Sequence, residues 1–184
     1  MTASSDGLAA RLQPCGPVNT AASAERLWAT LGPVAETEGW GPMLEHAWPA
    51  LAPVAGASPY LAGLMRRWPA VLHRILSDPV EDRLADVIAR TIALTGGTDD
   101  MRAPLRHLKA ELHLLTALAD LGGVWDLDQV TGALSRFADV ASRAALSAVA
   151  EDLRRRSKLL TPANDTRGPI PGLFGLAMGK HGAF

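Results

Sequence analysis

The sequence predicts an all-α protein, a helical bundle with a short strand at its C-terminal end. Three start signals for helices are spread along the chain, at Ser58, Asp78 and Asp126. A leucine stripe of helical period runs from Leu105 to Leu115. No alternation typical of a strand occurs before residue 169. Short glycine-rich turns separate the helical segments, as they do in bundles.

The composition is that of one globular domain of 184 residues, 48% of them hydrophobic. Its 18 Lys and Arg against 19 Asp and Glu leave a net charge of −1, which argues against a dedicated nucleic-acid binder. Cys15 is the single cysteine, so no internal disulfide can form. The longest uncharged stretch, residues 47–65, contains prolines and glycines that disfavour a membrane helix. With no signal-peptide pattern, we expect a cytoplasmic protein with no membrane partner.

Prolines and glycines punctuate the N-terminal third of the chain. Residues 1–22 are small and polar, and we expect a disordered tail there. A short helix is expected over residues 23–31, ended by Gly32-Pro33. In residues 39–57 the prolines and glycines are too dense for long regular elements.

Clear helix punctuation begins at Ser58, which can cap a helix with Pro59 at its first position. Trp68-Pro69 interrupts the apolar pattern, which then resumes. Asp78 repeats the start signal, and Gly96-Gly97 is expected to close the helix that follows.

The last two helices have the most regular pattern. The leucine stripe stops at Gly122-Gly123. Asp126 and Gln129 form the pattern of a capping box, which predicts the start of a helix of roughly 30 residues. Small residues in its apolar line, such as Ala141 and Ala144, indicate close approach to a neighbouring helix.

Residues 161–184 differ in character from the helical region over residues 23–160. A polar linker rich in proline and glycine occupies residues 161–171. The uncharged run over residues 172–178 favours a short buried strand, and Gly179-Lys180-His181-Gly182 follows as a tight turn. A lone strand without a partner is unstable, so we expect the truncated start of a further domain here.

Spacing does not predict a catalytic or metal site in the helices. His107 and Glu111 stand one helical turn apart, but no third and fourth ligand lie near them in the sequence. Cys15 has no activating partner in the expected tail. Asp126 and Asp128 are explained by capping and by the favourable position of an acid at a helix N-terminus. We therefore predict neither catalytic nor metal-binding residues.

The basic clusters have two interpretations. Arg154, Arg155, Arg156 and Lys158 lie at the end of the long helix, where cations suit the negative helix terminus. A docking surface for an acidic partner is the alternative. Arg66-Arg67 leaves the same two interpretations open.

Gly179-Lys180 invites comparison with a phosphate-binding loop. A Walker A motif needs glycine at position 174 and serine or threonine at position 181, but these residues are Phe174 and His181. That motif therefore fails. A glycine-rich turn still exposes backbone N–H groups, and Lys180 adds a positive charge, so the turn can hold a nucleotide phosphate.

Three blocks of sequence, in order, suggest a family. They are the segment beginning Ser58-Pro-Tyr-Leu-Ala, the segment from Leu114 to Asp139, and GLFGLAMGKHGAF at residues 172–184. Together they resemble the bacterial bifunctional glutamine synthetase adenylyltransferase/adenylyl-removing enzymes over residues 58–184. The third block resembles the opening of the first nucleotidyltransferase domain of that family, although Ala177 and His181 depart from its usual residues.

The resemblance implies a nucleotidyltransferase that uses ATP and Mg²⁺. It implies AMP transfer from ATP to a tyrosine of glutamine synthetase, and removal of that AMP by phosphorolysis. In the family the metal-binding carboxylates follow the Gly-Lys turn and would lie beyond Phe184. Only Gly179, Lys180 and Gly182 correspond to the family's site, as nucleotide-binding residues. The alternative is that these glycines only close a turn after the strand. We therefore expect this chain alone to be inactive and to bind no cofactor tightly.

The resemblance also implies partners. These are glutamine synthetase and, as a second candidate, a nitrogen-signalling regulatory protein. The alternative from a different class is a non-catalytic helical protein-interaction module, which would bind such partners through the helices of residues 58–160.

Overall fold

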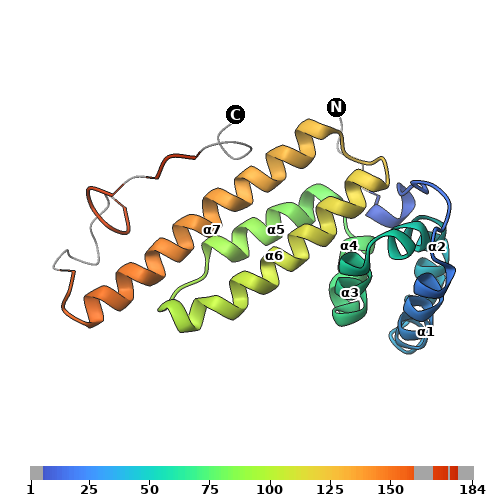
Figure 1. Cartoon of the computed structure of the whole chain (residues 1–184), viewed down its shortest axis with the longest axis horizontal. Coiled ribbons are helices and arrows are strands. Elements are labelled where there is room, and N and C mark those ends of the chain that lie inside the picture. The colour runs from blue at the N-terminus through green and yellow to red at the C-terminus, as the bar shows by residue number, and fades with distance from the viewer. Residues whose placement is uncertain (1–5, 160–167, 174, 178–184) are drawn as a thin grey trace.

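Two groups of helices make up the protein (Figure 1). The computed structural model describes residues 6–159, 168–173 and 175–177, and in these residues every regular element is helical. The all-α class is therefore confirmed. The elements are η1 (Leu8–Ala10), α1 (Ala21–Thr37), α2 (Gly41–Ala57), α3 (Pro59–Arg67), α4 (Pro69–Ser77), α5 (Val80–Ile92), α6 (Thr98–Leu121) and α7 (Leu127–Arg155). No helix in these described ranges has the length and apolarity needed to cross a membrane.

Helix α6 belongs to both groups. The long helices α5, α6 and α7 lie side by side, and α1–α4 gather at one end of them (Figure 1). In its middle, α6 packs Leu108 and Leu112 against Val87 of α5 and Phe137 of α7. Beyond that point its leucines enter a larger core formed with η1 and α1–α4. These residues of α6 are Leu114, Leu115 and Leu118.

Local capping chemistry confirms two of the predicted helix starts. The Ser58 hydroxyl accepts a hydrogen bond from the Leu61 N–H at 3.2 Å. Asp126 and Gln129 form the reciprocal capping box, with N···O distances of 2.8 and 3.0 Å. The interruption at Trp68-Pro69 is also confirmed, because α3 ends and α4 begins there.

The third predicted start is displaced. The N-cap of α5 is Pro79, and the Asp78 carboxylate instead accepts a hydrogen bond from Arg83 at 3.3 Å. The helix ends at Ile92, before Gly96-Gly97, and Gly97 is the N-cap of α6. The guanidinium of Arg83 thus gives the Asp78 carboxylate a charge-assisted hydrogen bond in place of the predicted bond to a backbone N–H.

Two expectations about the N-terminal helices are wrong. Helix α1 continues through Gly32-Pro33 to Thr37, and α2 forms a 17-residue helix with Pro49 and Pro53 inside it. An internal proline costs about 3 kcal/mol, but burial of an apolar helix face offsets that cost. Residues Leu51 to Ala55 of α2 are all buried, which supplies the burial.

Part of the expected tail is packed. Leu8 is fully buried, and its N–H donates to the Asp78 carbonyl at 3.1 Å. The Gln13 N–H donates to the Gly122 carbonyl at 3.0 Å, at the turn that joins α6 to α7. This finding differs from the disorder expected for residues 1–22. In the sequence, the apolar pair Leu8-Ala9 was the feature that could have indicated this packing.

The expected C-terminal strand is not observed in the described residues. Positions 172, 173 and 175–177 form no strand, while Phe174 and Met178 lie outside the described residues. Leu173 and Leu176 are exposed, the latter by 82%. Their side chains therefore lack the burial that the strand interpretation required.

Leu112→Ala should lower the free energy of unfolding by about 2–5 kcal/mol, because the side chain is 1% exposed among the long helices. Urea unfolding followed by far-UV circular dichroism measures this loss. The matched control is Leu127→Ala, at a side chain that is 74% exposed, with an expected change within about 0.5 kcal/mol. Equal losses in the two variants would contradict the assignment of the core face of α6.

Candidate functional site

The residues predicted to bind nucleotide lie outside the part of the chain that the structure describes. They are Gly179, Lys180 and Gly182. Their role remains a prediction from the sequence. Within the described residues, the polar groups that converge lie where α5 and α6 meet.

Glu111 is the centre of a buried ion-pair network between α5 and α6. Its side chain is 1% exposed, and its Oε1 accepts a hydrogen bond from Arg83 Nη2 at 2.6 Å. Its Oε2 accepts from Arg90 Nη2 at 2.9 Å. Asp86 bridges the two arginines, at 2.8 Å from each. With Asp78, which also accepts a hydrogen bond from Arg83, two cations and three carboxylates meet at the contact of the two helices.

This network gives Glu111 partners other than His107, the residue one helical turn before it. Both carboxylate oxygens of Glu111 already accept hydrogen bonds from guanidinium groups. Among the described residues, no three potential metal-ligating side chains come together. Glu111 therefore acts as a structural anion.

The charged forms of the two acids are favoured. Burial alone would raise the pKa of Glu111, but hydrogen bonds from Arg90 and Arg83 outweigh it and hold the pKa below its usual value. Burial likewise raises the pKa of Asp86, but the hydrogen bonds and positive charges of Arg90 and Arg83 together outweigh it and lower the pKa. The carboxylates therefore stay ionised at neutral pH.

His107 lies against Trp68, with ring centroids 3.8 Å apart. Burial lowers the pKa of His107, and the positive charges of Arg90 and Arg74 add to this effect against the opposing influence of Glu111. The imidazole is therefore neutral at physiological pH and serves as a packed aromatic group.

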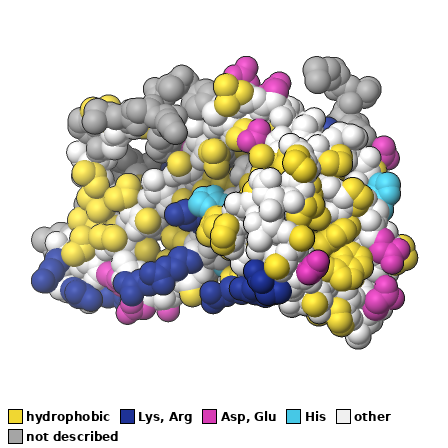
Figure 2. Space-filling view, turned by 45° about the vertical axis from the view of Figure 1, so that its right-hand side comes forward, with side chains coloured by type: hydrophobic (Ala, Val, Ile, Leu, Met, Phe, Trp, Pro, Cys, Tyr) yellow, Lys and Arg dark blue, Asp and Glu magenta, His cyan; other side chains and the backbone are white. Residues whose placement is uncertain are grey.

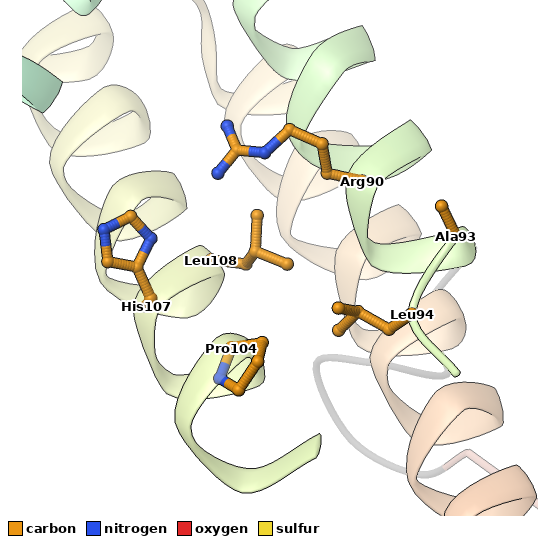
Figure 3. Close-up of a pocket in the computed structure, with 6 residues that line it drawn as sticks. All are labelled: Arg90, Ala93, Leu94, Pro104, His107 and Leu108. Carbon is orange, nitrogen blue, oxygen red and sulfur yellow. The ribbon is translucent and has the colours of Figure 1, made fainter. Parts of the chain in front are cut away.

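A pocket of about 320 Å³ opens beside His107, between α5 and α6 (Figure 3). Most of its walls are apolar, and the Arg90 guanidinium points away toward the ion-pair network. The lining residues are Arg90, Ala93, Leu94, Pro104, His107 and Leu108. Without a nucleophile or a paired acid and base in its walls, this pocket is suited to hold an apolar side chain and not to perform catalysis.

The other candidates from the sequence have structural roles or open surfaces. Asp126 caps α7 as predicted, and Asp128 is an exposed acid in the first turn of that helix. Cys15 is exposed with a free thiol. Arg154 donates to the Pro169 carbonyl at 3.0 Å, and Arg155 pairs with Asp152. Two cations of the basic cluster at the end of α7 are thus already bonded to groups of the same chain.

Asp152 connects α7 to α6 at the far end of the long helices. Its carboxylate accepts hydrogen bonds from the Thr98 hydroxyl and N–H at 2.5 and 3.0 Å, which ties α7 to the first turn of α6. These bonds, together with Arg155, hold the pKa of Asp152 well below its usual range.

The network around Glu111 was missed by reasoning from the sequence. Its local signal was present in α5, where Arg83, Asp86 and Arg90 have the i, i+3 and i, i+4 spacings of helix ion pairs. The pairing with Glu111 joins residues 28 and 21 positions apart, which the spacing does not reveal.

Comparison with known proteins gives a consistent match. The sequence model of the glutamate-ammonia ligase adenylyltransferase family matches residues 48–184. The bifunctional glutamine synthetase adenylyltransferase/adenylyl-removing enzyme of Caulobacter vibrioides is 50% identical over 179 residues, 96% of this chain and 18% of that relative. The enzyme of the same name from Xanthobacter autotrophicus is 41% identical over 116 residues, which are 61% of this chain and 12% of that protein. The chain thus spans less than a fifth of these relatives. No solved structure matches it significantly.

Glu111→Gln should lower the free energy of unfolding at pH 7 by about 1–3 kcal/mol, because Arg83 and Arg90 lose a buried anion that accepts charge-assisted hydrogen bonds from both. The lowered pKa of Glu111 stabilises the fold above the ordinary glutamate pKa, and this stability is lost as the pH falls through and below about 4.5. The difference between wild type and variant should therefore shrink between pH 7 and pH 3. Urea unfolding at both values measures it.

The control for this variant is Asp86→Asn, which removes a carboxylate from the same network. Because Asp86 is 41% exposed, its loss should cost no more than about 1 kcal/mol. A stability difference for Glu111→Gln that is independent of pH would contradict the charged state assigned to the buried carboxylate.

Proposed function

The chain belongs to the glutamate-ammonia ligase adenylyltransferase family, and from that premise we propose that it is a helical part of an enzyme acting on glutamine synthetase. The enzyme would transfer AMP from ATP to a tyrosine of glutamine synthetase and remove that AMP by phosphorolysis. The observation that supports this most is 50% identity over 96% of the chain to a relative named for both activities.

The chemical step would depend on residues outside this chain. Nucleotidyl transfer needs paired carboxylates that hold Mg²⁺ against the triphosphate. The printed sequence has no acidic residue after Asp165. Glu111 and Asp86 are committed to arginines. The chain by itself is therefore an inactive piece of the proposed enzyme.

The nucleotide contact of this chain would come from the Gly-Lys turn. Lys180 would supply one positive charge, and glycines at 179 and 182 would allow backbone N–H groups to approach a phosphate of ATP. These donors suit a phosphate but offer no ligand for Mg²⁺. The boundary at residue 161 is part of the same proposal. It separates the helical region from the linker and the start of the nucleotidyltransferase domain.

The partners follow from the proposed reaction. Glutamine synthetase is the substrate protein, and a nitrogen-signalling regulatory protein is the second partner that we propose. The cytoplasm, where ATP is abundant, is the proposed location.

A second function from another class is a protein-interaction module. The observation that favours it is the row of exposed apolar side chains along α7, among them Leu127, Leu134 and Val149. A single exposed leucine needs no explanation, but several on one helix indicate a surface that another polypeptide can cover.

A chimera tests the first proposal. This chain should replace the matching segment of the Caulobacter relative and leave AMP transfer to glutamine synthetase within about tenfold of the parent rate, because half of the aligned residues are identical. AMP incorporation is followed by intact mass in the presence of ATP and Mg²⁺. The isolated 184-residue chain, assayed in parallel, should incorporate no AMP.

Two results would contradict the proposal. A folded chimera without transfer or removal of AMP would show that the chain does not serve this enzyme. Transfer by the isolated chain that disappears on Lys180→Ala would show a complete catalytic centre within these 184 residues.

A further inference from the structure

Six exposed cations lie on two neighbouring parts of the fold. Three come from the pair α3 and α4, and three from the solvent face of α6. We call this set the basic surface; it consists of Arg66, Arg67, Arg74, Arg102, Arg106 and Lys109. The residues from α6 follow one another at spacings of four and three, so they share one helix face.

An aromatic contact joins the two parts of the basic surface. Trp68, between α3 and α4, lies against His107 of α6. The Arg67 guanidinium carbon is 5.7 Å from the centroid of the Trp68 ring. Arg106 directly precedes His107 in α6. Arg74 is close enough to lower the pKa of His107. One cation from α3 and one from α4 therefore lie near this aromatic pair, to which α6 contributes the histidine.

Acidic side chains are missing from this part of the sequence. No Asp or Glu occurs between Glu45 and Asp78. Between Met101 and Ala119 the single acid is Glu111, which is buried and neutralised by two other arginines. No ion pair with a described residue is found for any of the six cations.

The charges are partly segregated on the face of the molecule shown in Figure 2. Lys and Arg side chains follow the lower edge of the face shown in Figure 2, whereas Asp and Glu gather mostly at its top and right-hand side. The whole chain has 18 cations and 19 acids, so the residues outside the basic surface have 12 cations against the same 19 acids. A local excess of like charge costs free energy unless an anion is near.

We propose that the basic surface binds an acidic segment of a protein partner. A short acidic segment would meet only the six cations, whereas a long polyanion such as nucleic acid would also meet the acidic remainder of the chain. His107 lines the neighbouring pocket, whose apolar walls would take a leucine-sized side chain of the same segment. The proposal does not depend on AMP transfer and is testable without glutamine synthetase.

The probe is a fluorescein-labelled peptide of about ten glutamates with one central leucine, and its binding is measured by fluorescence anisotropy at about 50 mM NaCl. The wild-type chain should bind this peptide, and added salt should weaken the complex. Arg67→Glu/Arg106→Glu should weaken binding by at least about tenfold. Arg102→Glu/Lys109→Glu, which leaves the contact with Trp68 intact, should have the same effect.

The matched control is Arg136→Glu/Arg143→Glu, which makes the same change of charge at exposed positions of α7. It should keep the affinity within about twofold, since its charges lie outside the basic surface. A peptide with serine in place of leucine should bind more weakly, because it leaves the pocket unfilled. Circular dichroism verifies that each variant is folded.

Three results would overturn the proposal. The first is no binding of the peptide by the wild-type chain. The second is an equal effect of the control and the two test variants, which would show attraction without a defined surface. The third is tighter binding of a 12-base-pair DNA duplex at the same ionic strength, lost in the same test variants, which would assign the surface to nucleic acid.

Discussion

The carboxylate of Glu111 is held between Arg83 and Arg90 in the middle of α6, and the arrangement of the helices depends on this contact. A charged group that is 1% exposed has lost nearly all of its hydration, and that loss costs several kcal/mol unless cations replace the water. Arg83 and Arg90 both extend from α5. The register of α5 against α6 is therefore constrained, because another register would leave one of these charges buried without a partner.

This constraint acts at the point where the two cores of the protein meet. Leu112, the next residue of α6, belongs to the core of the long helices, whereas Leu114 belongs to the core with α1–α4. Because α6 contributes to both cores, holding it in place at Glu111 positions both groups of helices along this one helix. His107, one turn earlier, is placed against Trp68 of the α3–α4 junction by the same geometry. The pocket and the basic surface take their positions from that contact.

Local chemistry explains why much of the fold was predictable from the sequence. The caps at Ser58 and Asp126 involve residues three positions apart, so the pattern alone identifies them. Helix α2 was missed because its internal prolines are outweighed by burial, which depends on the tertiary structure. The partners of Glu111 were missed for the same reason. The nucleotide-binding role of Gly179, Lys180 and Gly182 still rests on sequence.

The most direct measurement of the central claim is a double-mutant cycle on the free energy of unfolding, with Arg83→Met, Glu111→Met and the double variant. Each single variant leaves an opposite charge buried, whereas the double variant replaces the pair with apolar side chains of similar length. The account predicts that the double variant is more stable than the sum of the single losses implies, by about 1–3 kcal/mol. Additivity within about 0.5 kcal/mol would contradict it.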